Sequence, residues 1–152
     1  MNKKFFLAVL NILTLCIIIG AVSIFLVKDG YWIGIVLILL SILCLLSLLP
    51  FKIGLKATLP DIYFGLIDNG ILAIMAIFGG HFGGVTGAIL GGVVGNAITD
   101  GIAGIFEGYS AEKLRLQLVS EERTMLKSAV GKMAGCLFGA GVILLIANLF
   151  KF

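Results

Sequence analysis

Charged residues are scarce in this chain of 152 residues. Asp, Glu, Lys and Arg together make up 12% of it, whereas hydrophobic residues make up 61%. The mean hydropathy of +1.21 lies far outside the range of soluble domains. This composition predicts an integral membrane protein, and the length allows one compact bundle with no separate soluble domain.

The residues that most often carry enzyme chemistry are also few. The three cysteines, Cys16, Cys44 and Cys136, lie apart in apolar runs, and no pair has the spacing of a redox or zinc site. We interpret them as packing residues. His81 is the single histidine, and no nucleophile occurs beside a base. The sequence therefore predicts a protein that is not an enzyme, binds no nucleic acid and holds no permanent cofactor.

Long apolar runs take up most of the chain. Each is long enough to cross about 30 Å of hydrocarbon as a helix. The prediction is an all-α polytopic membrane helix bundle forming a single domain, 1–152, with a charged cytoplasmic segment at 107–128. The five predicted transmembrane helices are 5–27, 31–49, 62–79, 82–106 and 129–149.

The positive charges predict the orientation of these spans. Of the eleven Lys and Arg residues, all but Lys28 and Lys151 fall on one side of a five-span arrangement. The positive-inside rule then places the N-terminus in the cytoplasm and the C-terminus outside. We expect a bacterial inner (plasma) membrane location.

Polar side chains occur inside two of the predicted spans, where each is costly unless it faces water, an ion or a partner. The spacing of Asn96, Asp100 and Glu107 places them on one helical stripe that runs from the fourth span to its cytoplasmic end. We predict an ion pathway formed by Asp68, Asn69, Asn96, Asp100 and Glu107.

Carboxylate oxygens and a thioether together suit a divalent transition metal. The predicted metal ligands are Asp68, Asp100, Met75 and Glu107. The alternative is that Asp68 and Asp100 only hydrogen-bond to other helices, and that Met75 only packs. Asn69 and Asn96 fit interhelical hydrogen bonding as well as ligation.

Small residues recur every four positions along the fourth span, at Gly83, Gly87, Gly91 and Gly95. This ridge predicts close helix packing, either within one chain or between copies. Between the third and fourth spans, His81 is expected in a solvated glycine turn. In the charged segment, Glu112, Glu121 and Glu122 are candidates for cytoplasmic cation loading, although a solvated helix face explains them equally simply.

Three motifs in this region resemble the vacuolar iron transporter family: GLIDNG at 65–70, GNAI at 95–98 and EGYSAEK at 107–113. The resemblance covers about 61–113 and extends less clearly to 149. It implies an antiporter that exchanges iron or manganese for protons and works as a dimer with the pathway at its interface. The carry-over is closest for Asp68 and weaker for Asn96 and Glu107. The methionine expected in the family's second helix would fall near Gly104, and Met75 could replace it from the other helix.

The leading hypothesis is thus a proton-coupled membrane transporter for a divalent transition metal, iron or manganese, acting as a homodimer or higher homo-oligomer in membrane lipid. A non-transporting scaffold or assembly subunit, whose polar residues fix helix pairing, is the first alternative. A passive ion pore is the second.

Overall fold

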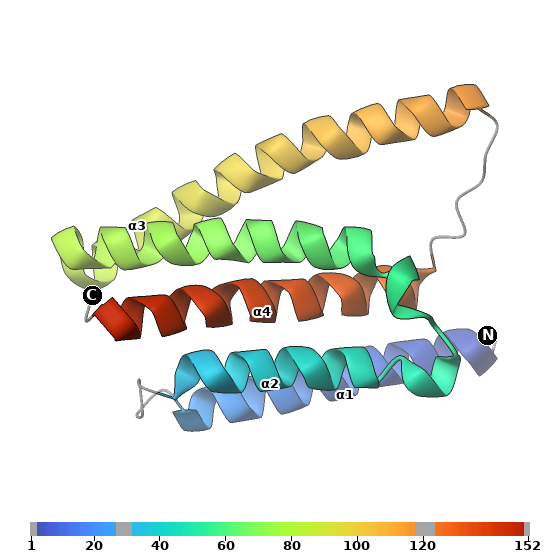
Figure 1. Cartoon of the computed structure of the whole chain (residues 1–152), viewed down its shortest axis with the longest axis horizontal. Helices are drawn as coiled ribbons and strands as arrows, with labels where there is room; N and C mark the ends of the chain where they lie inside the picture. The colour runs from blue at the N-terminus through green and yellow to red at the C-terminus, as the bar shows by residue number, and fades with distance from the viewer. Residues whose placement is uncertain (1–2, 27–31, 118–123, 151–152) are drawn as a thin grey trace.

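The fold consists of long helices packed side by side (Figure 1). The computed structural model describes residues 3–26, 32–117 and 124–150, and of residues 3–4, 26, 57 and 106–117 it describes the backbone alone. No β-strand occurs in this described part. The helices are α1 (Lys3–Leu26), α2 (Ile33–Leu46), α3 (Leu59–Gln117) and α4 (Met125–Phe150), with short 3₁₀ turns η1 (Leu49–Phe51) and η2 (Leu55–Ala57) between α2 and α3.

The described residues contain four helical stretches that are long and apolar enough to cross a membrane, and the second of them combines α2 with η1. The qualifying stretches are Phe5–Phe25, Ile33–Phe51, Leu59–Ile105 and Met125–Phe150. Large apolar side chains cover the outside of the bundle, and Ile24 and Phe25 are 78% and 81% exposed. Such a surface would be unstable in water and matches a lipid environment. The chain is therefore an integral membrane protein, and the part of it that the structure describes is all-helical.

Helix α3 doubles back on itself at Gly84. This residue has φ 58° and ψ −142°, a conformation that is essentially restricted to glycine, and it interrupts the helical geometry. The reversal divides α3 into a first arm, residues 59–83, and a second arm, residues 85–117 (Figure 1). The hairpin expected from sequence is present. Helical geometry continues through His81, so the prediction that this residue lies in a loop is wrong, although its side chain is exposed as expected.

Glycines bring the two arms into backbone contact. A Cβ atom at Gly79 would collide with the backbone of Gly87, and a Cβ at Gly91 would collide with the carbonyl group of Met75. Three residues of the predicted ridge, Gly87, Gly91 and Gly95, thus pack within one chain. A Cβ at Gly83 would meet nothing within 4 Å, because this residue lies at the reversal, beyond the last facing pair.

Helix α4 packs against both α2 and the first arm of α3. Gly135 and Gly139 lie against the backbone of Ile62 and Leu66 in the first arm. On the α2 side, the buried Ser41 hydroxyl donates to the Ala134 carbonyl at 2.8 Å. The first arm therefore lies between α4 and the second arm, and Figure 1 shows this order. Helix α4 begins at Met125, four residues before the span predicted from residue 129.

The reversal at Gly84 predicts a specific cross-link. A Cβ at Gly92 would lie 3.9 Å from the Ala76 Cβ, and disulfides need about 3.5–4.5 Å. With the three native cysteines replaced by Ala, the pair Ala76→Cys and Gly92→Cys should form an intramolecular disulfide on mild oxidation, measured as protection from a maleimide–polyethylene glycol label.

The control pair combines Ala76→Cys with Gly101→Cys. Gly101 is an exposed position on the second arm, like Gly92 part of residues 85–117, and this pair should remain fully labelled. In a straight helix, residues 76 and 92 would be about 24 Å apart. Equal labelling of both pairs would therefore contradict the hairpin.

Candidate functional site

Asp68 lies at the contact between the two arms of α3. The hydroxyl of Thr99, on the second arm, donates a hydrogen bond to Oδ1 of Asp68, on the first arm. Thr99 is only 5% exposed, and Asp68 is half-buried. The same hydroxyl oxygen lies 3.1 Å from the Gly95 carbonyl oxygen and 3.0 Å from that of Asn96. A carboxylate from one arm is thus held by a hydroxyl from the other.

Asn96 and Asp100 form a second polar pair, within the second arm. The Asn96 side-chain amide donates to Oδ2 of Asp100 at 2.8 Å. This i, i+4 contact places both side chains on one stripe of the helix, as their spacing predicted. Asn96 is half-buried, whereas Asp100 is exposed on the outside of the hairpin.

The two predicted carboxylates therefore lie at the same level of the hairpin but on different faces. Asp68 contacts Thr99, the residue directly before Asp100. Successive helical residues point about 100° apart. Asp68 is consequently inside the hairpin, while Asp100 borders its outer surface.

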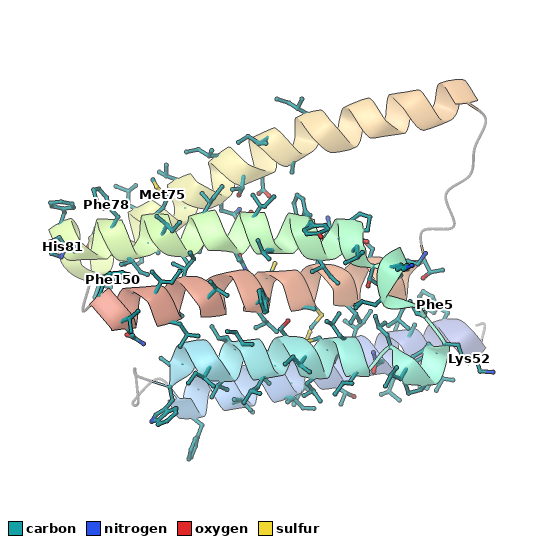
Figure 2. The ribbon with its side chains drawn as sticks, viewed as in Figure 1. Phe5, Lys52, Met75, Phe78, His81 and Phe150 are labelled. Carbon is teal, nitrogen blue, oxygen red and sulfur yellow. The ribbon has the colours of Figure 1, made fainter. Side chains whose placement is uncertain are left out.

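Met75 packs between the arms, two helical turns from Asp68 toward the Gly84 reversal (Figure 2). A Cβ at Gly95 would lie 3.2 Å from the Met75 Cβ. Met75 therefore fills space between the helices.

At the reversal itself, the rings of His81 and Phe82 meet edge to face, with centroids 5.2 Å apart.

The other predicted site residues differ in how far they are described. Asn69 is half-buried in the first arm. Glu107 and Glu112 belong to the helical second arm, where only the backbone is described, and Glu121 and Glu122 lie outside the described residues. Within the described part of the chain, no three His, Cys, Asp or Glu side chains come together as ligands of one metal ion.

A further acidic residue, Asp61, lies at the start of the first arm, where α4 docks. It is 3% exposed, and its Oδ1 accepts a hydrogen bond from the Ser128 hydroxyl of α4 at 3.0 Å. Nearby, the Lys132 ammonium lies 4.4 Å from the centre of the Phe64 ring, a cation–π contact between the same two helices. These contacts fasten the start of α4 to the first arm.

Sequence reasoning missed both Thr99 and Asp61 as site residues. Thr99 continues the four-residue spacing of the glycine ridge, and that spacing favoured a packing role over a polar one. Asp61 lies one residue before the predicted third span, 62–79, and was therefore left out of the polar residues found inside the spans. The signal for Thr99 is its hydroxyl group, which lies on the same helical stripe as the glycine ridge.

Comparison with known proteins gives no family assignment. The chain matches no protein-family model, no curated protein and no solved structure. The class that the fold defines is a helical integral membrane protein with a glycine-packed hairpin. A function for this protein must therefore be argued from the geometry of that hairpin.

The Asp61–Ser128 contact predicts a stability effect. Ser128→Ala removes a donor from a buried carboxylate and should destabilise the protein by about 1–3 kcal/mol. The measurement is unfolding in detergent micelles, followed by circular dichroism. Ser23→Ala makes the same chemical change in α1, which makes few contacts with the rest of the bundle, and should change stability by less than about 0.5 kcal/mol. Equal effects of the two substitutions would show that the contact contributes nothing.

Proposed function

We propose that this protein is a proton-coupled transporter for a divalent transition metal, iron or manganese, in a bacterial inner membrane. The observation that carries the proposal is the Asp68 carboxylate, which is held between two apolar helices and contacts Thr99 of the facing arm. The vacuolar iron transporter resemblance of residues 61–113 points to the same aspartate. The other supporting features are the length of α3, the Asn96–Asp100 pair and the outer face of the hairpin.

The length of α3 supports five membrane crossings. Its apolar stretch, Leu59–Ile105, has 47 residues and would extend about 70 Å as a straight helix, more than twice the hydrocarbon thickness of a bilayer. Reversal at Gly84 gives two arms that each match one crossing. With α1, α2 and α4, five spans result, and the charge distribution orients the N-terminus inward and the C-terminus outward.

Asp68 then lies deep in the membrane. It is nine residues from the start of the first arm, a rise of about 14 Å, close to the middle of the hydrocarbon. A charged carboxylate there costs about 2.5–3.5 kcal/mol on insertion scales, and one neutral hydroxyl offsets only part of this cost. A bound cation or proton would remove the charge.

The ligand chemistry of the hairpin suits Mn²⁺ or Fe²⁺. Asp68 offers carboxylate oxygens between the arms, and Asp100 and Asn96 offer carboxylate and amide oxygens along the stripe of the second arm. Carboxylate oxygens bind hard and borderline divalent ions. A carboxylate holds either a metal ion or a proton, so the same groups could exchange one for the other. Glu107 extends the stripe toward the cytoplasmic end, and Met75 would add sulfur from the first arm after a rearrangement of the packing.

The outer face of the second arm supports a homo-oligomer. Asp100 lies on this face with Ile89 and Val93, each 63% exposed. In a single chain the carboxylate would border lipid, which is expensive. A second copy packed on this face would enclose Asp100 and place two stripes around one pathway.

One observation favours a scaffold role instead. The acids at 61, 68 and 100 each accept a hydrogen bond from a hydroxyl or amide group of the same chain. Such bonds can fix helix pairing without any transported ion. The scaffold reading therefore predicts that substitutions of these acids alter assembly while no ion crosses the membrane.

The deciding experiment is Mn²⁺ uptake into proteoliposomes, with internal pH recorded at the same time. Wild-type protein should move Mn²⁺ in exchange for protons. Asp68→Asn and Asp100→Asn should each slow uptake by about tenfold or more, because a neutral amide binds a divalent cation more weakly than a carboxylate. Asp29→Asn, between the first two apolar runs, is the matched control and should leave the rate unchanged.

Absence of Mn²⁺ and Fe²⁺ flux in the wild type would contradict transport and favour the scaffold. Flux without proton counterflow would favour the passive pore. Unchanged flux in both aspartate variants would refute the assignment of the pathway to these residues.

A further inference from the structure

We propose that Thr99 is a positioning residue for the cation site, acting through Asp68. The inference rests on the proposed function, because it assigns Thr99 a role in binding the transported ion. Its basis is the hydrogen bond from the Thr99 hydroxyl to Oδ1 of Asp68 across the hairpin. The contact joins residues that are 31 positions apart and lie on different arms.

The Thr99 hydroxyl has one proton and three acceptors within reach. Two are the carbonyl oxygens of Gly95 and Asn96, which also face the backbone N–H groups one turn further along the helix. The third is the Asp68 carboxylate, which would be ionised when it binds a cation, and hydrogen bonds to an ionised acceptor are about twice as strong as neutral ones. The hydrogen bond from the Thr99 hydroxyl to Asp68 is therefore the strongest of the three.

Another threonine of the same chain shows what a purely local bond looks like. The Thr14 hydroxyl donates to the Leu10 carbonyl of its own helix at 2.9 Å, on an exposed face of α1. That pattern is common for threonine inside helices. Thr99 differs because it is buried at a helix–helix contact and reaches a carboxylate on the facing arm.

Glycine packing makes this contact possible. Gly95 lies one turn before Thr99, and a Cβ at Gly95 would be 3.1 Å from the Cα of Leu72. The arms are thus close enough for a short side chain to span the gap. Serine would also reach Asp68, whereas valine would fill the same volume without donating a hydrogen bond.

The geometry indicates how Thr99 would act on a bound ion. By holding Oδ1, the hydroxyl would restrict rotation of the carboxylate and leave Oδ2 as the oxygen that binds a cation. Groups that fix the orientation of a metal ligand typically change affinity by about 10–100-fold when removed. Thr99 would therefore set the affinity for the ion without providing a charge of its own.

The test is Mn²⁺ binding to the full-length protein in nanodiscs, measured by electron paramagnetic resonance of the free ion. Thr99→Val should raise the Kd by about tenfold or more, and Thr99→Ser should bind like the wild type. Thr86→Val removes the hydroxyl of an exposed threonine on the same arm and should have no effect. In an Asp68→Asn background, Thr99→Val should cause no further loss.

A merely structural role would not give this pattern. Rescue by serine shows that the hydroxyl acts, and silence in the Asp68→Asn background shows that it acts through the carboxylate. If Thr99→Val does not yield a monodisperse protein, Thr99→Ala replaces it, since alanine removes the hydroxyl without adding bulk. Wild-type-like Mn²⁺ binding by the hydroxyl-free variant would overturn the role of Thr99 and leave the proposed transport function standing. Equal losses with and without the Asp68 carboxylate would also overturn it. A wild type that neither binds nor transports Mn²⁺ or Fe²⁺ would instead overturn the proposed function itself, and this inference with it.

Discussion

Backbone contact at glycine is the constraint on which the arrangement of these helices depends. The first arm of α3 meets the second arm at Gly79, Gly87 and Gly91, and it meets α4 at Gly135 and Gly139. In a membrane the hydrophobic effect does not drive helices together, so close van der Waals contact must do so. Side chains larger than glycine at these positions would separate the first arm from both neighbours.

The polar contacts of the first arm follow from that closeness. Thr99 reaches Asp68, and Ser128 reaches Asp61, only because the facing backbones are near. The two contacts lie on different interfaces of one helix, the first toward the second arm and the second toward α4. The first arm thus carries the buried Asp61 and the half-buried Asp68, whereas α1 lies at the edge of the bundle and exposes most of its apolar surface. Under the proposed function, the hairpin and α4 would form the functional unit, with α1 and α2 as its support.

Much of this arrangement could be predicted from the sequence because apolar length is a strong signal in membrane proteins. The runs at 5–27 and 31–49 correspond closely to α1 and α2. The glycine spacing correctly predicted close packing and left open whether it occurs within one chain or between copies. The exact point of reversal could not be predicted, since Gly79, Gly80, Gly83 and Gly84 all permit a turn and only the pairing of the arms selects Gly84. Asp68 and the Asn96–Asp100 stripe were evident as costly polar residues. The partners Thr99 and Ser128 were not, because a hydroxyl inside a helix satisfies itself locally unless a neighbouring helix brings an acceptor.

The central claim is that the interior of the hairpin holds a divalent cation at Asp68. Anomalous X-ray diffraction from crystals soaked in Mn²⁺, collected near the manganese absorption edge, tests it most directly. The account predicts an anomalous peak at the Asp68 carboxylate, between the two arms of α3 and beside Thr99. Anomalous peaks confined to the charged ends of the helices, with none between the arms, would contradict it.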